Sequence, residues 1–423
     1  MSQFILTRKQ ISYGNESIDF NNNSEIEITN INAKVHLQAL LNKLVLLAYF
    51  EQKKLINKTK IDLSINHFKN GQLSDNDFRI KRFVKVGRGQ TGAKNNLCDV
   101  PGVLVGQMTL DQNDYHTGLT VIKPHQDNCF NHKVVASSFV FNGYGKSVGL
   151  VQIDEIGIIE TPIVMTSTLN VGKISDAVVG VALEELDNTI TSINPVVLEC
   201  NDGQLNKSVD RILGVKEYQE ALANLKTDFC QGAIGAGRGM ICHGYKGGIG
   251  SSSRLFHFNN QDYYLGIILN SNFGSSDGNE LRFLGSKISG INEEVKPEQG
   301  SIVCVVATDL PLNERQLKRV LRRIEIGIGR TGSYAGNGSG DLFVGFTTAN
   351  GRDRFNKALQ EIKYIDDQCL DSFFRLVPEV TEEAVLNSML YAHGYHGYHK
   401  EVMSLGKKYN EFINLIDEEI IYK

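Results

Sequence analysis

A glycine-rich stretch that ends in three serines is the part of the sequence best suited to chemistry. Residues 235–254 are GAGRGMICHGYKGGIGSSSR, with seven glycines ahead of Ser251, Ser252 and Ser253. Glycine is favoured where a backbone takes positive φ or approaches another group closely. Gly250 has no Cβ to block attack by the Ser251 hydroxyl on its carbonyl carbon. We therefore predict that the chain cuts its own Gly250–Ser251 bond and frees Ser251 as an N-terminal nucleophile.

A serine at a chain N-terminus carries its own general base. The α-amino group has an ordinary pKa of about 7.7–8.0, so part of it is unprotonated near neutral pH. This amine can take the proton of the adjacent hydroxyl as the oxygen attacks a carbonyl carbon. Because three serines follow one another, Ser252 is the near alternative to Ser251. The predicted reaction is acyl transfer to the serine, followed by transfer to water.

Other chemistries fit this stretch less well. A phosphate-binding loop needs its lysine after the last glycine and a helix directly beyond it. Lys246 instead precedes the last glycines, and RLFHF at 254–258 is typical of a strand. Cys242 beside His243 could form a thiol–base pair, but its apolar surroundings favour a buried structural thiol. A histidine-rich segment contains His393, His396 and His399. Its interposed glycines favour a loop over a metal site, and we expect no cofactor.

The composition is that of a globular protein with balanced charge. The 423 residues are 41% hydrophobic and 22% charged, with a net charge of −4. This balance gives no reason to expect nucleic acid or an anionic membrane as a partner. Seven cysteines without a CxxC pair fit a reducing compartment. No segment has the apolar length of a signal peptide core or a membrane span, so we expect a cytoplasmic protein.

The first 80 residues differ from the rest of the chain. They are rich in Asn, Ile and Lys, poor in Gly, and lack Pro. Apolar residues at helical spacing over 32–57 predict one amphipathic helix there. We interpret 1–80 as an N-terminal extension of unknown role, and 81–423 as the domain that carries the chemistry.

Strands and helices are predicted in blocks along the second domain. Apolar runs rich in β-branched residues predict strands within 99–110, 117–124, 193–200, 265–274, 301–312 and 341–350. Helices are predicted over 174–186, after Asn313 as N-cap, and after Thr381 as N-cap with two glutamates in the first turn. Blocks of this kind favour a layered α+β sandwich over a doubly wound sheet.

Polar residues and glycines also cluster where predicted strands end. The clusters are Asn142–Gly145, Asn201–Gly203 with Asn206, and Gly336–Asp341. Side-chain amides and hydroxyls on such turns can stabilise an oxyanion. We expect some of these residues to lie near the nucleophile.

Eight motifs, taken together and in order, resemble the DmpA/BapA family of L-aminopeptidase/D-esterases and β-peptidyl aminopeptidases. They are CDVPGVLVGQMTL, TGLTVI, NGYGKSVGLVQIDEIGIIETPI, STLNVG, ECNDGQLN, GAIGAGRGMICHGYKGGIGSSSR, VATDLPL and RTGSYAGNGSGD. The resemblance runs from about Arg82 to the C-terminus. It implies a four-layer αββα sandwich related to N-terminal-nucleophile hydrolases. It also implies cleavage into an α chain ending at Gly250 and a β chain starting at Ser251, which stay together, commonly as a homotetramer.

The resemblance further implies roles for residues outside the serine stretch. An Asn and a Tyr form the oxyanion hole in the family. Asn206 is the best match for the former, although Lys207 stands where the family has Asp, and Tyr144 is a weaker match for the latter. Asn201 and Asp202 are expected to bind substrate.

Recognition of a free substrate N-terminus calls for a carboxylate, and Glu155 is the candidate, with Asp154 behind it. Thr308 and Asp309 in VATDLPL are expected to hold the new N-terminus of the β chain. The predicted function is a self-cleaving serine aminopeptidase or amidase acting on small peptides, amino-acid amides or esters. Two alternatives are an acyltransferase of ornithine-acetyltransferase type and a non-catalytic scaffold.

Overall fold

The computed structural model describes residues 86–283, 285–287, 297–356 and 358–405, together with four short strands nearer the N-terminus. The chain divides into two compact units. One comprises Met1–Phe78, Arg82–Lys85 and Leu405–Lys423, and the other, here called the large unit, comprises Arg79–Lys81 and Val86–Ser404. The helix predicted over 32–57 lies outside the described residues. That 1–80 form a separate extension stays a prediction.

The smaller unit contains an antiparallel sheet of four strands in the order β3-β2-β1-β4. Its strands are β1 (Phe4–Thr7), β2 (Gln10–Tyr13), β3 (Glu16–Asp19) and β4 (Glu25–Ile28).

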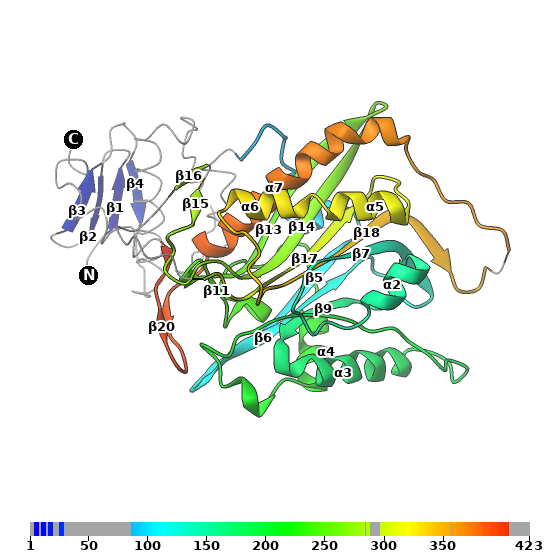
Figure 1. The fold of residues 1–423 in the computed structure, drawn as a ribbon, viewed down its shortest axis with the longest axis horizontal. Coiled ribbons are helices and arrows are strands. Elements are labelled where there is room, and N and C mark those ends of the chain that lie inside the picture. Colours follow the sequence, from blue (N-terminus) through cyan, green and yellow to red (C-terminus); the bar gives the residue numbers. More distant parts are fainter. Residues whose placement is uncertain are drawn as a thin grey trace. The chain divides into compact units, whose positions relative to one another are not determined.

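A six-stranded sheet dominates the large unit (Figure 1). Its strands, in spatial order, are β13 (Gly248–Phe258), β14 (Gln261–Asn272), β17 (Ser301–Thr308), β18 (Gly340–Asp353), β7 (His132–Gly143) and β8 (Ile158–Ile159). Only β17 and β18 pair in parallel within it. Asn259 and Asn260 join β13 to β14 with positive φ at both positions, the backbone that a tight two-residue hairpin requires. The strands predicted within 265–274, 301–312 and 341–350 are confirmed here.

A four-stranded sheet faces it. Its order is β10 (Val196–Cys200), β9 (Ile163–Ser167), β6 (Tyr115–Lys123) and β5 (Leu104–Gln112). These strands confirm those predicted within 99–110, 117–124 and 193–200. Successive residues of β6 point to opposite faces, so Val121 packs with the helices outside and Ile122 enters the core between the sheets.

One hydrophobic core joins the two sheets. It contains Ile122, Met165 and Leu198 from the four-stranded sheet and Ile268, Val305 and Val344 from the six-stranded sheet, all fully buried. Strands covered on both faces read as continuous apolar runs, which is why these segments were recognisable in the sequence.

Helices cover the outer faces of both sheets (Figure 1). On the four-stranded sheet lie α3 (Val171–Glu184) and α4 (Val215–Ala223). Against the six-stranded sheet pack α2 (Leu150–Ile156), α5 (Glu314–Leu321) and α7 (Leu370–Leu390), with α6 (Ile324–Arg330) against α7. Short ribbons are formed by β11 (Ile241–Cys242) with β12 (Tyr245–Lys246), β15 (Arg282–Phe283) with β16 (Ser286–Lys287), and β19 (Tyr395–His396) with β20 (Glu401–Val402). The chain therefore has a mixed α/β fold with several sheets.

Two helix starts were predicted from capping residues, and one is wrong. Asn313 does cap α5, since its side chain accepts a hydrogen bond from Gln316 N at 2.9 Å. Thr381 is not an N-cap: it lies inside α7, where its hydroxyl donates to the Val377 carbonyl at 2.8 Å. The helix passes through Pro378, which removes one backbone hydrogen bond. Burial of α7 on nearly every face outweighs that loss.

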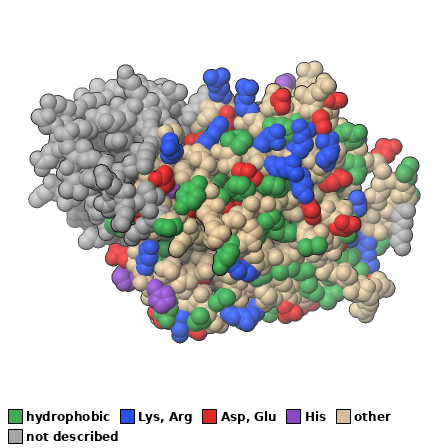
Figure 2. Space-filling model, viewed as in Figure 1, with side chains coloured by type: hydrophobic (Ala, Val, Ile, Leu, Met, Phe, Trp, Pro, Cys, Tyr) green, Lys and Arg blue, Asp and Glu red, His purple; other side chains and the backbone are tan. Residues whose placement is uncertain are grey.

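Basic side chains gather over α5, where Figure 2 shows a cluster of Lys and Arg. Several of them form ion pairs with carboxylates: Lys318 pairs with Asp154, and Arg315 pairs with Asp367 at 2.8 Å. The cluster is therefore locally balanced and gives no reason to expect a polyanionic partner. Among the residues that the structure describes, no helix is long and apolar enough to cross a membrane.

Candidate active site

Ser251 lies inside β13 and is fully buried. Its hydroxyl donates to the Ile267 carbonyl at 2.5 Å and accepts from Leu97 N at 2.9 Å. Its N–H donates to Gln231 at 2.7 Å, and its carbonyl accepts from the Asn387 side chain at 2.9 Å. Every polar group of Ser251 is engaged within the protein. A substrate must reach its nucleophile, and Ser251 has no exposed surface.

Packing alone explains why residue 250 is a glycine. β13 pairs with β14 without interruption through Gly250 and Ser251, opposite Leu269 and Ile268. A Cβ on Gly250 would lie 1.9 Å from the Ala384 carbonyl oxygen of α7. Glycine is needed here because helix and strand approach closely. The geometry does not support cleavage at the Gly250–Ser251 bond.

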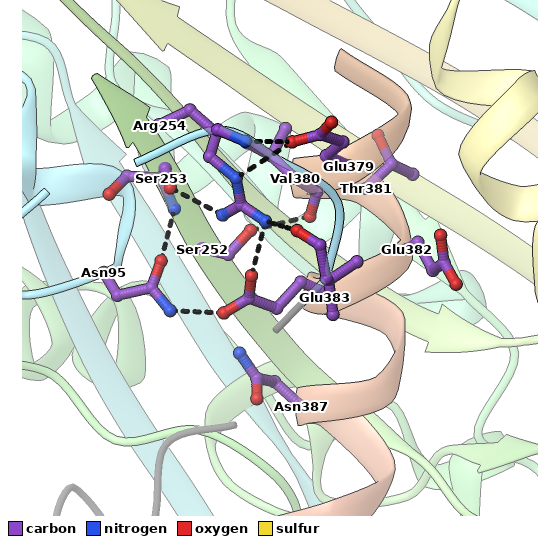
Figure 3. Close-up of polar contacts among 12 residues, drawn as sticks. Asn95, Ser252, Ser253, Arg254, Glu379, Val380, Thr381, Glu382, Glu383 and Asn387 are labelled. Atoms are coloured by element: carbon purple, nitrogen blue, oxygen red, sulfur yellow. Dashed lines mark hydrogen bonds and ion pairs between the residues drawn. The ribbon is translucent and has the colours of Figure 1, made fainter. Parts of the chain in front are cut away.

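The rest of the serine stretch also has structural partners (Figure 3). The Ser252 hydroxyl donates to the Val380 carbonyl at 2.6 Å, and the Ser253 hydroxyl donates to Asp99 at 2.6 Å. The Arg254 guanidinium, 1% exposed, forms an ion pair with Glu383 at 2.7 Å. Alternation along the strand thus directs Ser252 toward α7 and Ser253 toward the segment before β5. Ser252 is no better placed than Ser251 to act on a substrate.

Glu155 and Asp154 lie on α2, away from the serine stretch. α2 packs on β7, which is four strand spacings from β13, roughly 19 Å at about 4.8 Å per spacing. Glu155 is exposed, and Asp154 pairs with Lys318. The structure does not bring Glu155 to Ser251.

Thr308 and Asp309 tie two strands together at the end of β17. The Thr308 hydroxyl donates to the Tyr264 carbonyl at 2.7 Å, while the Asp309 carboxylate accepts from Tyr264 N at 2.6 Å. Burial raises the pKa of Asp309. These contacts fix the edge between β14 and β17, which is a structural role.

A second glycine–serine pair, Gly300–Ser301, lies where β17 begins. Gly300 has φ of +111°, and a Cβ there would lie 1.8 Å from the Asn272 carbonyl oxygen. Only glycine accepts both conditions. Ser301, 6% exposed, is the first residue of the strand, and its hydroxyl accepts from Gly340 N at 3.2 Å.

The cluster Gly336–Asp341 reaches this serine from β18. Gly340 is in register with Ser301. The two residues that flank Gly340 bond to each other, since the Ser339 hydroxyl donates to the Asp341 carboxylate at 2.5 Å. Burial raises the pKa of Asp341 to about 6, and the charge of Glu298 acts in the same direction. The carboxyl therefore loses its proton near pH 6 and not near pH 4.

The cluster Asn142–Gly145 meets the same place from β7. Gly143 is in register with Gly340, and a Cβ on Gly340 would lie 2.9 Å from Gly145 Cα. Tyr144, 60% exposed, stands at this turn with Lys146 Nζ 4.3 Å from its ring centroid. The neighbourhood of Gly340 thus reaches the protein surface at Tyr144.

The cluster around Asn201 arrives from β10. The Cys200 thiol donates to the Ser301 carbonyl at 3.6 Å, and the Asn272 side chain, in register with Ser301, donates to the Asn201 carbonyl at 3.0 Å. Buried Asp202 follows, and burial raises its pKa to about 6.

Asn206 is anchored to this cluster. Its amide nitrogen donates to Asp202 at 3.0 Å, and its amide oxygen accepts from His116 N at 3.1 Å. An amide nitrogen carries two hydrogens, and within the described part of the chain only Asp202 accepts one of them, so the second can bind a further acceptor.

All three predicted polar clusters therefore converge, but on Ser301 and not on Ser251. The sequence analysis did not single out Ser301, although the sequence held a signal for it. Gly300 directly precedes the apolar run SIVCVVAT, so a serine follows a glycine at the very start of a predicted strand. The glycines before Ser251 are denser and form the stronger sequence signal.

Comparison with known proteins agrees with this fold. Residues 95–403 match peptidase family S58. The chain is 32% identical over 363 residues to the beta-peptidyl aminopeptidase BapA of Sphingosinicella microcystinivorans, covering 76% of this chain and 90% of the relative. It is 34% identical over 337 residues to the enzyme of the same name from Sphingosinicella xenopeptidilytica, covering 71% and 82%.

Solved structures share this fold. A Pyrococcus horikoshii OT3 protein aligns with a TM-score of 0.74 and 37% identity, covering 80% of this chain and 99% of its own. The L-aminopeptidase D-Ala-esterase/amidase of Ochrobactrum anthropi aligns with a TM-score of 0.73 and 31% identity, covering 80% and 98%. That enzyme is described as a prototype for the serine aminopeptidases and a variant among the Ntn hydrolase fold. The chain described here belongs to peptidase family S58.

Proposed function

We propose that this protein is a self-processing serine aminopeptidase whose nucleophile is Ser301, freed by cleavage of the Gly300–Ser301 bond. One observation carries the proposal. Gly300, in the left-handed region, directly precedes a strand-initial serine on which three polar clusters converge. The family and the aminopeptidase names of the relatives support the reaction class.

Self-cleavage at this bond needs only groups already in the chain. The Ser301 hydroxyl oxygen attacks the Gly300 carbonyl carbon, and the amide nitrogen takes the hydroxyl proton as the C–N bond breaks. The product is an ester between Gly300 and Ser301. Water hydrolyses it to a Gly300 carboxylate and a serine with a free α-amine and hydroxyl. The backbone N–H of Gly340, 3.2 Å from Ser301 Oγ, orients the attacking oxygen.

Turnover then uses the new N-terminus. The Ser301 α-amine takes the hydroxyl proton as the oxygen attacks the carbonyl carbon of a substrate's first residue. The substrate amine leaves with that proton, and water releases the acyl group. Small peptides, amino-acid amides or esters with a free N-terminus are the proposed substrates.

Two of the predicted site residues keep proposed roles in this arrangement. Asn206, held by Asp202, has a second amide hydrogen for the oxyanion, and Tyr144 stands at the solvent opening near Gly340. Asp202 follows the strand whose last residue contacts Ser301, so it is better placed than Glu155 to receive a substrate ammonium group.

The layers support a finer assignment of the fold and assembly. Helices α5 and α7, the six-stranded sheet, the four-stranded sheet, and helices α3 and α4 follow one another through the cores. We propose that these are the four layers of an αββα sandwich. We propose further that the two chains made by cleavage stay together as a homotetramer.

Denaturing mass spectrometry of the purified full chain tests the proposal. We expect two fragments, the smaller starting at Ser301. Cleavage before Ser251 would give a small fragment 50 residues longer, which would restore the serine stretch as the site of chemistry. A single chain of 46.9 kDa, inert toward amino-acid p-nitroanilides, would overturn the self-processing aminopeptidase altogether.

A further inference from the structure

Glu298 lies two residues before Gly300, and its buried carboxylate is bound by the loop at 333–336. Glu298 is only 4% exposed. Its carboxylate accepts hydrogen bonds from the Ser333 hydroxyl, from Tyr334 N at 2.9 Å and from Gly336 N at 3.2 Å. Its own N–H donates to the Tyr334 hydroxyl at 2.8 Å. The three donors to the carboxylate are neutral groups. A buried carboxylate without a cation is costly unless several donors hold it, so this contact set is specific.

The opposite side of the same segment is held by the main chain. Glu298 forms an isolated β-bridge with Ser275, and Gln299 N donates to the Gly274 carbonyl at 3.5 Å. Gly300 packs against the Asn272 carbonyl oxygen. The residues just before the proposed scissile bond are thus fixed between β14 and the loop at 333–336.

That loop leads directly to the group that orients the attacking oxygen. It continues into Gly340, whose N–H binds Ser301 Oγ. Gly336 is itself fixed, because its carbonyl accepts from the Asn142 side chain at 2.9 Å. Glu298 therefore connects the carbonyl side of the bond to the hydroxyl-orienting side.

We propose that Glu298 is a positioning residue for self-cleavage, holding the Gly300 carbonyl in place for attack by the Ser301 hydroxyl. This inference rests on the proposed function. Attack within a chain depends steeply on geometry, and a misplacement of about 1 Å costs on the order of a hundredfold in rate. Once the bond is cut, the reacting carbonyl belongs to the substrate. Glu298 should then matter for maturation and much less for turnover.

The test compares the rate of maturation with the rate of turnover in one full-length variant, Glu298→Gln. Chain made by cell-free synthesis is followed after a chase, and the first-order rate of cleavage is read from denaturing gels. We expect cleavage to slow by roughly tenfold to a hundredfold. The kcat/KM toward an amino-acid p-nitroanilide, per mole of cleaved chain, should stay within about twofold of the unmodified protein.

Two further variants guard against a merely structural effect. Glu160→Gln removes another buried carboxylate that accepts a backbone N–H, from Asn194 at 2.8 Å, and should leave the cleavage rate unchanged. Tyr334→Phe removes only the hydroxyl that accepts from Glu298 N, at a residue 60% exposed, so folding should be retained. It should slow cleavage by a smaller factor than Glu298→Gln.

The outcomes separate this inference from the function beneath it. If the unmodified chain cuts before Ser301 and both Glu298→Gln and Tyr334→Phe cut as fast, the role of Glu298 is overturned while the function stands. Equal losses in cleavage and in turnover per cleaved chain, with a lower Tm, would also overturn it in favour of a structural role. No cleavage before Ser301 in the unmodified chain would overturn both.

Discussion

Two glycine–serine pairs in the same sheet both lie close to a backbone carbonyl, but they differ in backbone conformation and in position along the strand. At Gly250 the missing Cβ makes room for the Ala384 carbonyl of a helix, and Ser251 lies mid-strand with every polar group bonded inside the protein. At Gly300 the backbone has φ of +111°, and Ser301 begins its strand. The first pair joins a strand to a helix, and the second lies at a strand start where loops meet.

The difference shows why position within a strand outweighs glycine density. A mid-strand peptide has its N–H and carbonyl committed to neighbours, and moving it disrupts a ladder of hydrogen bonds. The residue just before a strand lies outside its ladder of hydrogen bonds and can adopt unusual dihedral angles. Strained angles of this kind are found at functional sites.

The largest expected effect separates the two serines directly. Ser301→Ala should abolish self-cleavage and reduce amidase activity by at least about a thousandfold, because no other hydroxyl replaces the nucleophile. Ser251→Ala should cut normally and lose about 1–3 kcal/mol of unfolding free energy, since Leu97 N loses its buried acceptor. Fragment masses and urea denaturation measure these two effects. If Ser251→Ala stops cleavage and Ser301→Ala does not, Ser251 is the nucleophile and Ser301 has a structural role.

The next effect concerns the oxyanion. Asn206→Ala should lower kcat of the cleaved enzyme roughly a hundredfold, the usual cost of losing one oxyanion donor. Asn350→Ala is the matched control, because Asn350, on β18 of the six-stranded sheet, is a buried amide that donates to the Leu312 and Lys363 carbonyls. Comparable losses of kcat in both variants would mean that Asn206 only supports the fold.

Much of the fold could be predicted from local sequence, because its signals are local. Apolar β-branched runs predicted the buried strands, and Asn313 as an N-cap predicted the start of α5. Thr381 followed by two glutamates carried the same kind of signal and was wrong. Packing of α7 against the sheet decides where that helix begins, and a capping motif contains no information about packing.

The polar surroundings of Ser301 could be predicted only in part, for a related reason. Residues at strand ends, such as Asn206 and Asp341, were recognisable as polar clusters, because turn residues have a local signature. Which serine they surround depends on strand order: β7 and β18 lie far apart in the sequence and become neighbours only in the folded sheet. The raised pKa of Asp341 is likewise a product of burial, which no single position in the sequence reveals.

Asp341, next to the residue in register with Ser301, should make the stability of the protein depend on pH. The pKa of Asp341 is raised from 3.8 to about 6, so between these values the folded chain holds a proton that the unfolded chain has lost. Stability should therefore fall as pH rises from about 4 to 6 and stay level above that window. Asp341→Asn removes this loss, worth up to about 3 kcal/mol.

The measurement for Asp341 is urea denaturation between pH 4 and 7 in the uncut Ser301→Ala background. Asp202 has a pKa raised in the same direction, so a weaker slope should persist in Asp341→Asn. An unchanged slope would show that the Asp341 carboxyl is not desolvated in the folded protein.

The smallest effect tests the packing explanation of the first pair. In Gly250→Ala the new methyl group meets the Ala384 carbonyl, and α7 must move away from β13. Overpacking of this kind costs about 1–3 kcal/mol, seen as a lower Tm. The cut should still fall before Ser301, because β17 and its loops lie across β14 from this contact. A chain that folds with unchanged Tm but is no longer cut would show that Gly250 serves chemistry after all.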